Sequence, residues 1–265
     1  LARKQPVLNA TIVVALAVGL GLSGVAYTVA SAFLFAELPL PAGSRFVRVT
    51  ARSGADGSPV TFTRGQFEAL KGAAGDFEYL GVIADGRVNI LDEAAGVEAL
   101  AGARILPDAF RLLPYRPLVG RTLVPADGAP GGPPVAVLGE EIWERRFGRD
   151  ASVVGRTVDL GGVRTEVVGV LPAEAGFPNR PDVWLPFNVA DVPDDTSVVS
   201  ARVTFFGVLR EGVPIESASA RLAALAAGLD RVGSGPSLRV RVSRYTELAQ
   251  SGLVFLLMGG LVSVV

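Results

Sequence analysis

The feature that most restricts how this chain can fold is a long stretch without charge near its beginning. After Arg3 and Lys4, no formally charged residue occurs from Gln5 to Ala36, a run of 32 residues. As a helix, the 27 residues from 10 to 36 would be about 40 Å long, more than the roughly 30 Å of a bilayer's hydrocarbon core. Twelve of the 27 are Ile, Val, Leu or Phe, and together they favour insertion by about 4 to 7 kcal/mol. The run therefore predicts a transmembrane helix over residues 10–36.

The charges on either side of this run indicate its orientation. The basic pair precedes the run and Glu37 follows it. Because positively charged flanks stay on the cytoplasmic side, residues 1–9 are expected in the cytoplasm and the chain after Glu37 outside the membrane. A cleaved signal peptide is the alternative, since Ala30-Ser31-Ala32 fits the cleavage pattern. The apolar core is far longer than the about 7 to 15 residues of a signal peptide, which favours a retained anchor.

The same run contains the dinucleotide-binding pattern G-x-G-x-x-G at residues 19–24. That motif requires a preceding strand, a following helix and an acidic residue about 20 positions later. Here the flanks form one continuous apolar run, and the first acid, Glu37, follows Gly24 too closely. We therefore interpret these glycines as small residues that let membrane helices approach each other.

A second uncharged stretch closes the sequence, from Leu253 to Val265. Its 13 residues are fewer than the about 17 to 25 that a span needs. We interpret residues 251–265 as the truncated start of a second transmembrane helix. Since the sequence begins with Leu1 rather than Met, we expect the chain to be a piece of a longer membrane protein. The alternative is a buried helix at the end of a complete protein.

The composition excludes most reactive chemistry. The chain has no cysteine and no histidine, which removes disulfides, thiolate nucleophiles, Cys/His metal sites and imidazole bases. A formal net charge of −1 gives no general attraction to nucleic acid. Neither lysine, Lys4 or Lys71, follows a glycine, so the phosphate-binding loop G-x-x-x-x-G-K-[ST] is absent. We predict that the chain is not an enzyme and holds no cofactor.

The acidic clusters do not change this prediction. They are Glu140, Glu141 and Glu144, and Asp191, Asp194 and Asp195. The first three have the spacing of a helix face, and the aspartates lie in a loop without the spacing of a known Ca²⁺ loop. The serines lack a histidine partner for nucleophilic catalysis. No catalytic, cofactor-binding or metal-binding residue is predicted.

Residues 37–250, between the two apolar runs, carry nearly all of the charge and are expected to fold outside the membrane. In a first half, residues 37–117, alternation predicts a strand over 45–52, and Thr63 is placed to cap a helix. Short strands are expected at 79–84, 88–91 and 97–104. Asp85-Gly86 is typical of a hairpin turn and would separate the first two.

The middle, residues 118–188, differs in its pattern of predicted elements and is interpreted as an inserted β-rich subdomain. Its expected elements are a Pro- and Gly-rich loop at 125–134, a buried strand at 135–138, an amphipathic helix at 140–147, and strands at 156–160 and 164–170. The charged residues of the helix are expected to face solvent. The last two strands should form a β-hairpin around Gly161-Gly162. Val-Gly-Arg-Thr, which occurs at 119–122 and 154–157, is interpreted as a turn followed by a strand start.

The second half, residues 189–250, has the same strand–helix–strand pattern as the first. A strand at 201–210, an alanine-rich helix at 215–229 and a strand at 238–242 are expected. Because two similar halves flank a different middle, the predicted fold class is α+β, an open sheet with helices on one face and one insertion.

An ordered series of short motifs accompanies these elements. It comprises Val135-Ala136-Val137-Leu138, Trp143-Glu144-Arg145-Arg146-Phe147-Gly148, Val154-Gly155-Arg156-Thr157-Val158, Val167-Val168-Gly169-Val170-Leu171-Pro172 and Asp182-Val183-Trp184-Leu185-Pro186. Before it come the apolar span 9–35, Leu38-Pro39-Leu40-Pro41, and Phe110 with Val119-Gly120-Arg121-Thr122. With these motifs the chain resembles, over nearly its whole length, the MacB/FtsX-type permeases of ABC transporters, which carry a MacB-like extracytoplasmic core domain. It is most similar to their duplicated, acidobacterial type.

The resemblance implies a fold and a function. The first transmembrane helix would lead into two porter-like α+β halves, residues 37–117 and 189–250, with the subdomain 118–188 inserted between them. The chain would be a permease subunit in the bacterial inner membrane, with residues 37–250 extracytoplasmic. Its outer domain would transmit ATPase-driven movement for the export or extraction of a substrate.

The resemblance also implies partners. They are a cytoplasmic ABC ATPase that binds the ATP, a second permease copy or homodimer, and the lipid bilayer; a periplasmic adaptor is left open, and nucleic acid is not expected. Two other functions remain as alternatives. One is a two-helix sensor with an extracytoplasmic ligand-binding domain, and the other is a secreted enzyme released at Ala32.

Overall fold

The computed structural model describes residues 43–60, 62–92, 96–188, 203–229 and 238–245, together with Ala17, Gly21 and Gly24. The chain divides into two units, Leu1–Pro39 with Thr246–Val265, and Leu40–Tyr245. Apart from those three single residues, the predicted spans over 10–36 and 251–265 lie outside the described residues. Within the described part, no helix combines the length and the apolar character that crossing a bilayer requires.

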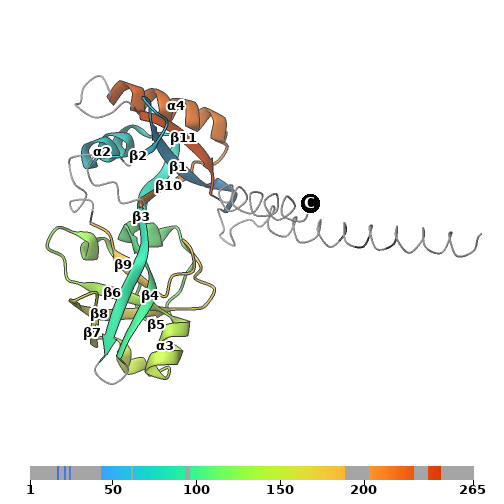
Figure 1. The fold of residues 1–265 in the computed structure, drawn as a ribbon. Helices are drawn as coiled ribbons and strands as arrows, with labels where there is room; N and C mark the ends of the chain where they lie inside the picture. The colour runs from blue at the N-terminus through green and yellow to red at the C-terminus, as the bar shows by residue number, and fades with distance from the viewer. Residues whose placement is uncertain are drawn as a thin grey trace, which may run out of the picture. The chain divides into compact units, whose positions relative to one another are not determined.

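The described strands of the second unit belong to one sheet (Figure 1). They are β1 (Phe46–Ser53), β2 (Pro59–Val60), β3 (Phe77–Asp92), β4 (Gly96–Ile105), β5 (Val119–Gly120), β6 (Val135–Gly139), β7 (Thr157–Leu160), β8 (Val163–Leu171), β9 (Val183–Pro186), β10 (Val203–Leu209) and β11 (Leu238–Arg244). Their order is β11-β1-β10-β3-β4-β9-β6-β8-β5, with β2 beside β1, and β7 beside β3 and β8.

The helices are α2 (Arg64–Ala73), α3 (Glu140–Phe147) and α4 (Ile215–Leu229), and 3₁₀ turns occur at η2 (Gly43–Arg45), η3 (Pro107–Arg111), η4 (Pro125–Gly128) and η5 (Ala151–Val153). Both α3 and α4 have the bounds expected from the sequence. The cap predicted for α2 is confirmed, because the Thr63 hydroxyl accepts from the Gln66 amide and the Gln66 side chain accepts from the Thr63 amide. With its fold of mixed helices and sheet, the unit is α+β.

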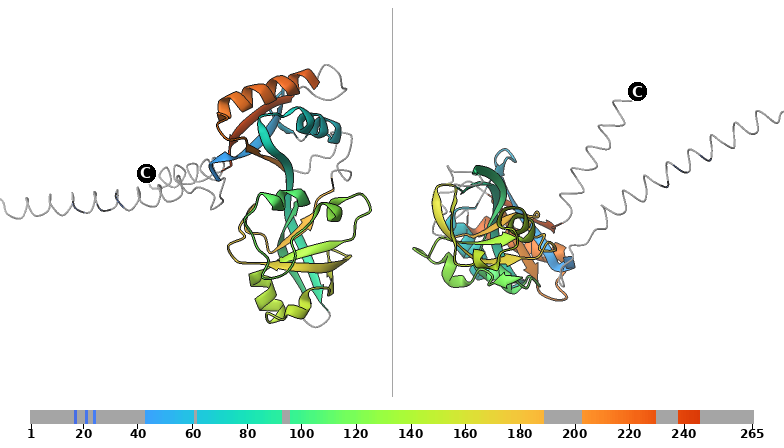
Figure 2. Two further views of the ribbon diagram at one scale, coloured as in Figure 1. Left: turned by 180° about the vertical axis from the view of Figure 1, so that it is seen from behind. Right: turned by 90° about the horizontal axis from the view of Figure 1, so that it is seen from below.

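The first core lies between α2, α4 and one face of β1, β3, β10 and β11. Strand β1 shows why, since Val47, Val49 and Ala51 alternate along it and are all buried in this core. On the helix side, Leu222 of α4 is 1% exposed. Helix α4 lies along β11, the edge strand of this part of the sheet (Figure 2).

The second core lies among β6, β7, β8, β9 and α3, and includes Ile90 of β3 and Leu100 of β4. Its remaining buried members are Ala136, Leu138, Ile142, Trp143, Phe147, Val153, Val158, Leu160, Val167, Val170 and Val183. The border expected at residue 118 therefore does not mark where this core begins. Two of its members precede residue 118, because β3 extends from the first core into the second and carries its partner β4 with it.

The hairpin turn predicted at Asp85-Gly86 is wrong. Strand β3 runs through these residues, which pair with Ala103 and Gly102 of β4. A two-residue hairpin of this type needs positive φ angles, and neither Asp85 nor Gly86 has one. The two strands are connected instead through residues 93–95, next to the terminal pair Asp92 and Gly96. Three predicted short segments thus form one long antiparallel ladder, and the intact pairing on both sides of Gly86 outweighs the local turn signal.

The hairpin predicted around Gly161-Gly162 is confirmed. Strands β7 and β8 pair from Leu160 and Val163 outward, and both glycines have positive φ, 64° and 84°. Of the two Val-Gly-Arg-Thr motifs, only the second is a turn followed by a strand start, with Val154 and Gly155 in a turn before β7. In the first motif Val119 and Gly120 are themselves strand β5. Both glycines have positive φ and both motifs bond to β8, since β5 pairs with it and the Gly155 amide donates to the Val167 carbonyl over 2.8 Å.

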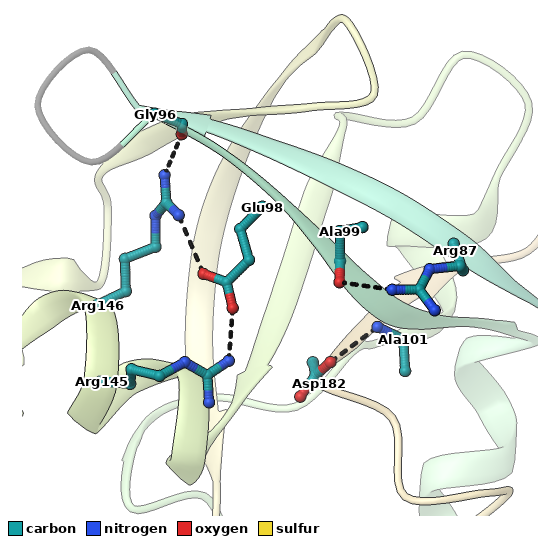
Figure 3. A network of polar contacts seen from close by, with 8 residues as sticks. All are labelled: Arg87, Gly96, Glu98, Ala99, Ala101, Arg145, Arg146 and Asp182. Atoms are coloured by element: carbon teal, nitrogen blue, oxygen red, sulfur yellow. Dashed lines mark hydrogen bonds and ion pairs between the residues drawn. The ribbon is translucent and has the colours of Figure 1, made fainter.

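The expectation that the charges of α3 face solvent is wrong for Arg146, whose side chain is 4% exposed. Figure 3 shows that it reaches the end of the β3–β4 ladder at Gly96, the first residue of β4. Its guanidinium donates to Glu98 over 3.1 Å and to the Gly96 carbonyl over 2.7 Å, while the exposed Arg145 donates to the other Glu98 oxygen over 2.7 Å. Hydrogen bonds from these arginines hold the pKa of Glu98 below its usual range. The helix is therefore attached to β4 by charge as well as by its apolar face.

We predict that Arg146→Ala lowers the free energy of unfolding by about 1.5–3 kcal/mol, because a buried, charge-assisted bond and the packing of its stem are lost. The matched control is Arg145→Ala. Because Arg145 bonds to the same carboxylate from an exposed position, its loss should lower the free energy of unfolding by less than about 1 kcal/mol. The measurement is urea unfolding followed by the fluorescence of the two tryptophans, Trp143 and Trp184. Equal effects of the two substitutions would contradict the role given to burial.

A second buried charge holds the loop before β6. The Asp127 carboxylate, whose residue is 5% exposed, accepts two bonds from the Arg121 guanidinium, at 2.7 and 3.0 Å, and one from the Val124 amide at 2.8 Å. Burial raises the pKa of Asp127, but the bonds from Arg121 and Val124 outweigh it and the pKa is lowered. Arg121 belongs to the first Val-Gly-Arg-Thr motif, so that motif is tied to η4.

Because the pKa of Asp127 is lower in the folded state, its ionised form contributes stability above the unfolded pKa of about 3.9, and this contribution is lost as the pH falls through the folded pKa. We predict that Asp127→Asn lowers the free energy of unfolding by about 1.5–3 kcal/mol at neutral pH. The deficit should shrink on acidification, since the parent carboxylate then becomes neutral too. Urea unfolding across the pH range measures this; Glu68→Gln, at an exposed carboxylate of α2, is the control. A deficit that does not vary with pH would refute the assignment.

Candidate functional site at the junction of the two cores

Aromatic side chains gather on the sheet face opposite α2 and α4. Alternation along β1 places Phe46 on this face, since Val47 belongs to the first core. Phe206 of β10 stacks on Phe46 at 6.4 Å between ring centroids, and Tyr79 of β3 lies 5.4 Å from Phe206. Tyr245, which follows β11, completes the group and is 7% exposed. The face thus has an apolar surface of its own.

Phe177, from the segment between β8 and β9, fills the centre of this group. Its ring lies 5.5 Å from that of Phe46, 5.3 Å from that of Phe206 and 5.2 Å from that of Tyr245. Phe177 is 2% exposed. Edge-to-face and tilted ring pairs at such distances add to the free energy gained by burial. One residue of the second part of the fold thereby contacts two strands that enclose the first core, β1 and β10, and the residue that follows β11.

The backbone of Phe177 is bonded on both sides. Its amide donates to the Tyr115 hydroxyl over 3.1 Å, and its carbonyl accepts from Nε1 of Trp184 over 3.0 Å. Trp184 is 1% exposed and lies in β9, opposite Ala103 of β4 and Val137 of β6. The ring that reaches the first part is therefore held rigidly by the strands of the second.

Polar groups border the aromatic group. The Asn179 amide donates to Asp85 of β3 over 2.8 Å, and the Arg48 guanidinium lies over the Tyr245 ring, 5.0 Å from its centroid. Burial raises the pKa of Asp85, against smaller opposing effects of Asn179 and Arg48. Burial also raises the pKa of Tyr245 to about 12. At neutral pH this phenol is protonated and does not serve as a base.

Further polar groups at the junction bond one segment to another. The Tyr79 hydroxyl donates to Asp108 over 2.8 Å, and burial raises the pKa of Tyr79. Among the described residues, no three acidic side chains are grouped so as to hold a metal ion. A cleft of about 720 Å³ runs beside the ladder, bordered by Asp85, Arg87 and Arg104 among others.

Of the six acidic residues singled out in the sequence, one is bonded within the fold, two are exposed, and three lie outside the described residues. Glu140 forms an ion pair with Arg149 and accepts from the Ala173 amide. Glu141 and Glu144 are exposed on α3. The cluster Asp191, Asp194 and Asp195 is not among the described residues.

Sequence reasoning did not single out the junction. Phe177 stands in a loop rich in Pro, Gly and charge, where no periodicity marks it as buried. The one available signal was its isolation, since a large aromatic residue in a polar loop needs a surface to pack against.

Gly81 provides a test of the packing at this face. A Cβ there would overlap Cε1 of Tyr79 and lie 2.7 Å from its hydroxyl oxygen, and the ring is held by its bond to Asp108. We predict that Gly81→Ala lowers the free energy of unfolding by about 1–3 kcal/mol. Gly86→Ala, on the same strand with no atom within 4 Å of the new Cβ, should change it by less than about 0.5 kcal/mol. Chemical denaturation compares the two, and a harmless Gly81→Ala would contradict the packing.

The fold recurs in solved structures. The periplasmic region of MacB from Actinobacillus actinomycetemcomitans is 14% identical, with a TM-score of 0.58 over 78% of this chain and 92% of that one. A domain of a proposed permease protein from Porphyromonas gingivalis is 18% identical, with a TM-score of 0.58 over 77% and 92%. The extracellular domain of the noncanonic ABC-type transporter YknZ from Gram-positive bacteria is 19% identical, with a TM-score of 0.56 over 75% and 99%. At these identities the likeness concerns the fold.

No curated protein matches the sequence significantly. A family model described as the MacB-like periplasmic core domain matches residues 10–225, which is most of the chain. The family expected from the sequence motifs is thereby confirmed, and the mixed α+β, porter-like domain agrees with it. This chain belongs to the MacB-like periplasmic core domain family.

Proposed function

We propose that the chain is part of the permease subunit of an ABC transporter. In this proposal the folded body at residues 40–245 stands outside the membrane and transmits movement that a separate cytoplasmic ATPase drives. The movement would serve the export or extraction of a substrate. Membership of the MacB-like family supports a permease, and the geometry of the body supports transmission of force.

The observation that carries the proposal is that the folded body begins and ends at the same place. Strands β1 and β11 are antiparallel neighbours, with Val47 opposite Arg244. The Tyr245 amide donates to the Phe46 carbonyl over 3.2 Å. The segments that precede β1 and follow β11 in the sequence are therefore attached to adjacent points of one sheet. A displacement of either segment would therefore exert force on the same pair of hydrogen-bonded strands, β1 and β11.

The proposal assigns the remaining roles to partners. ATP would bind the ATPase, since this chain has no phosphate-binding loop. Residues 10–36 and the region from residue 251 onward would lie in the bacterial inner membrane, beside a second permease copy. Residues 36–41 and 244–251 would be the two stalks that carry the movement outward.

Nucleotide-dependent crosslinking between the stalks tests the proposal. The chain has no cysteine, so Pro41→Cys with Glu247→Cys would place the only two thiols of this chain in the stalks. In the full-length permease purified with its ATPase, we expect the crosslinking yield to differ between the nucleotide-free and ATP-bound states, because the ATPase repositions the membrane helices.

The control pair is Arg52→Cys with Arg239→Cys, which are exposed register partners of β1 and β11. This pair should crosslink equally in both states, since it lies within one hydrogen-bonded ladder. A stalk pair that behaves like the control pair would refute the transmission of movement.

The two-helix sensor stays a second candidate because of the cleft along the ladder, which could hold a small ligand. The two proposals differ in the segment that each requires after residue 265. A sensor requires a cytoplasmic kinase, cyclase or chemotaxis module, and a permease requires further apolar spans. The downstream reading frame distinguishes them.

A further inference from the structure

The two cores are connected by a ladder with a weak point. Strand β3 passes from one core to the other, with β4 paired along it: Ala84 packs against the first core, and Val88 and Ile90 pack in the second. Halfway between them, Gly86 and Gly102 face each other as register partners. Two paired glycines provide no cross-strand side-chain contact, which weakens a ladder at that point. Strand β9 pairs with β4 at this level, with Val183 opposite Gly102, whereas the described partners of β3 besides β4 end at Ala84 on one side of Gly86 and begin again at Ile90. A connection only three strands wide can bend unless another contact prevents it.

We propose that Phe177 is the positioning residue that supplies this contact, so that it locks the second core to the strand ends where the chain enters and leaves the folded body. The inference deepens the proposed function and rests on it, because the lock matters only if those strand ends carry a load. It assigns Phe177 a role in passing movement onward to the second core.

The ring of Phe177 contacts the residues at both strand ends. It contacts Phe46, the first residue of β1, and Tyr245, the residue after β11. Phe206 of β10, the neighbour of β1 on the other side, closes the pocket. Because packed rings leave no space, neither end can shift against Phe177 without opening a cavity or pushing the ring.

The attachment on the other side is stiff. Both backbone polar groups of Phe177 are bonded, to Tyr115 and to Trp184. The Trp184 indole is buried, and its strand β9 pairs with β4 and β6. A push on the ring is therefore passed to β6, whose Ala136 and Leu138 lie in the second core. The bond from Asn179 to Asp85 ties the same segment to β3, close to the glycine pair.

Spin-label distances between the cores test the lock in the chain itself, reconstituted in lipid nanodiscs without any ATPase. Ala69→Cys in α2 and Ala151→Cys in η5 are exposed and introduce the only thiols. In the parent chain we expect one narrow distance distribution. In Phe177→Leu we expect that narrow distribution to be lost and replaced by a broad one, because the ladder then bends at its glycine pair.

The matched control is Phe62→Leu. Phe62 is as buried as Phe177, at 3% against 2%, but its ring packs on Phe205 inside the first core. Both substitutions should lower the melting temperature, and only Phe177→Leu should broaden the distance. Tyr245→Leu removes the contact from the opposite side and should broaden it as well, which keeps the test decisive if Phe177→Leu does not fold. A distribution that stays narrow in every folded junction variant, or that broadens equally in Phe62→Leu, overturns the lock.

A second measurement separates this inference from the proposed function. In the full-length permease with its ATPase, the lock predicts a nucleotide-dependent change in both the stalk crosslink and the Ala69–Ala151 label distance. In Phe177→Leu the stalk change should persist and the change in label distance should be lost. Retention of both changes overturns the lock alone. A stalk crosslinking yield that does not change with nucleotide overturns the proposed function, whatever the distances between the cores in the isolated chain.

Discussion

The antiparallel ladder of β3 and β4 is the element on which the rest of this structure depends. Its near end forms part of the sheet that α2 and α4 cover, and its far end supplies Ile90 and Leu100 to the second core. Ladder hydrogen bonds hold the strands at a fixed spacing along their length, and β3 supplies buried residues to both cores. The two parts of the fold therefore share one strand.

Buried charged side chains attach elements of this body to one another. Arg146 is buried and ties α3 to the end of β4 through Glu98, and Asp127 holds the first Val-Gly-Arg-Thr motif through Arg121. A buried charge is tolerated when its hydrogen bonds are satisfied, and these pairs meet that condition at the guanidinium Nη atoms and the carboxylate oxygens. Because the sequence has no cysteine, its segments are joined by packing, hydrogen bonds and such pairs rather than by disulfides.

Much of the local structure could be predicted because its causes are local. The Thr63 cap, the bounds of α3 and α4 and the Gly161-Gly162 hairpin each depend on residues within a few positions of one another. The prediction failed at Asp85-Gly86, where a turn signal stood in a strand, because pairing with Gly102 and Ala103 comes from another part of the chain. The solvent-facing role expected for Arg146 failed for the same reason, since Glu98 lies 48 residues away.

Composition, periodicity and ordered motifs were enough to predict the fold class and the family, which the family model confirms. Which segments meet became evident only in the folded chain. Phe177, Phe46 and Tyr245 are far apart in sequence and carry no shared pattern, yet their rings pack together, because burying large aromatic surfaces stabilises the fold wherever two faces come within reach. The way the two cores are joined is therefore a property of packing, which no local pattern encodes.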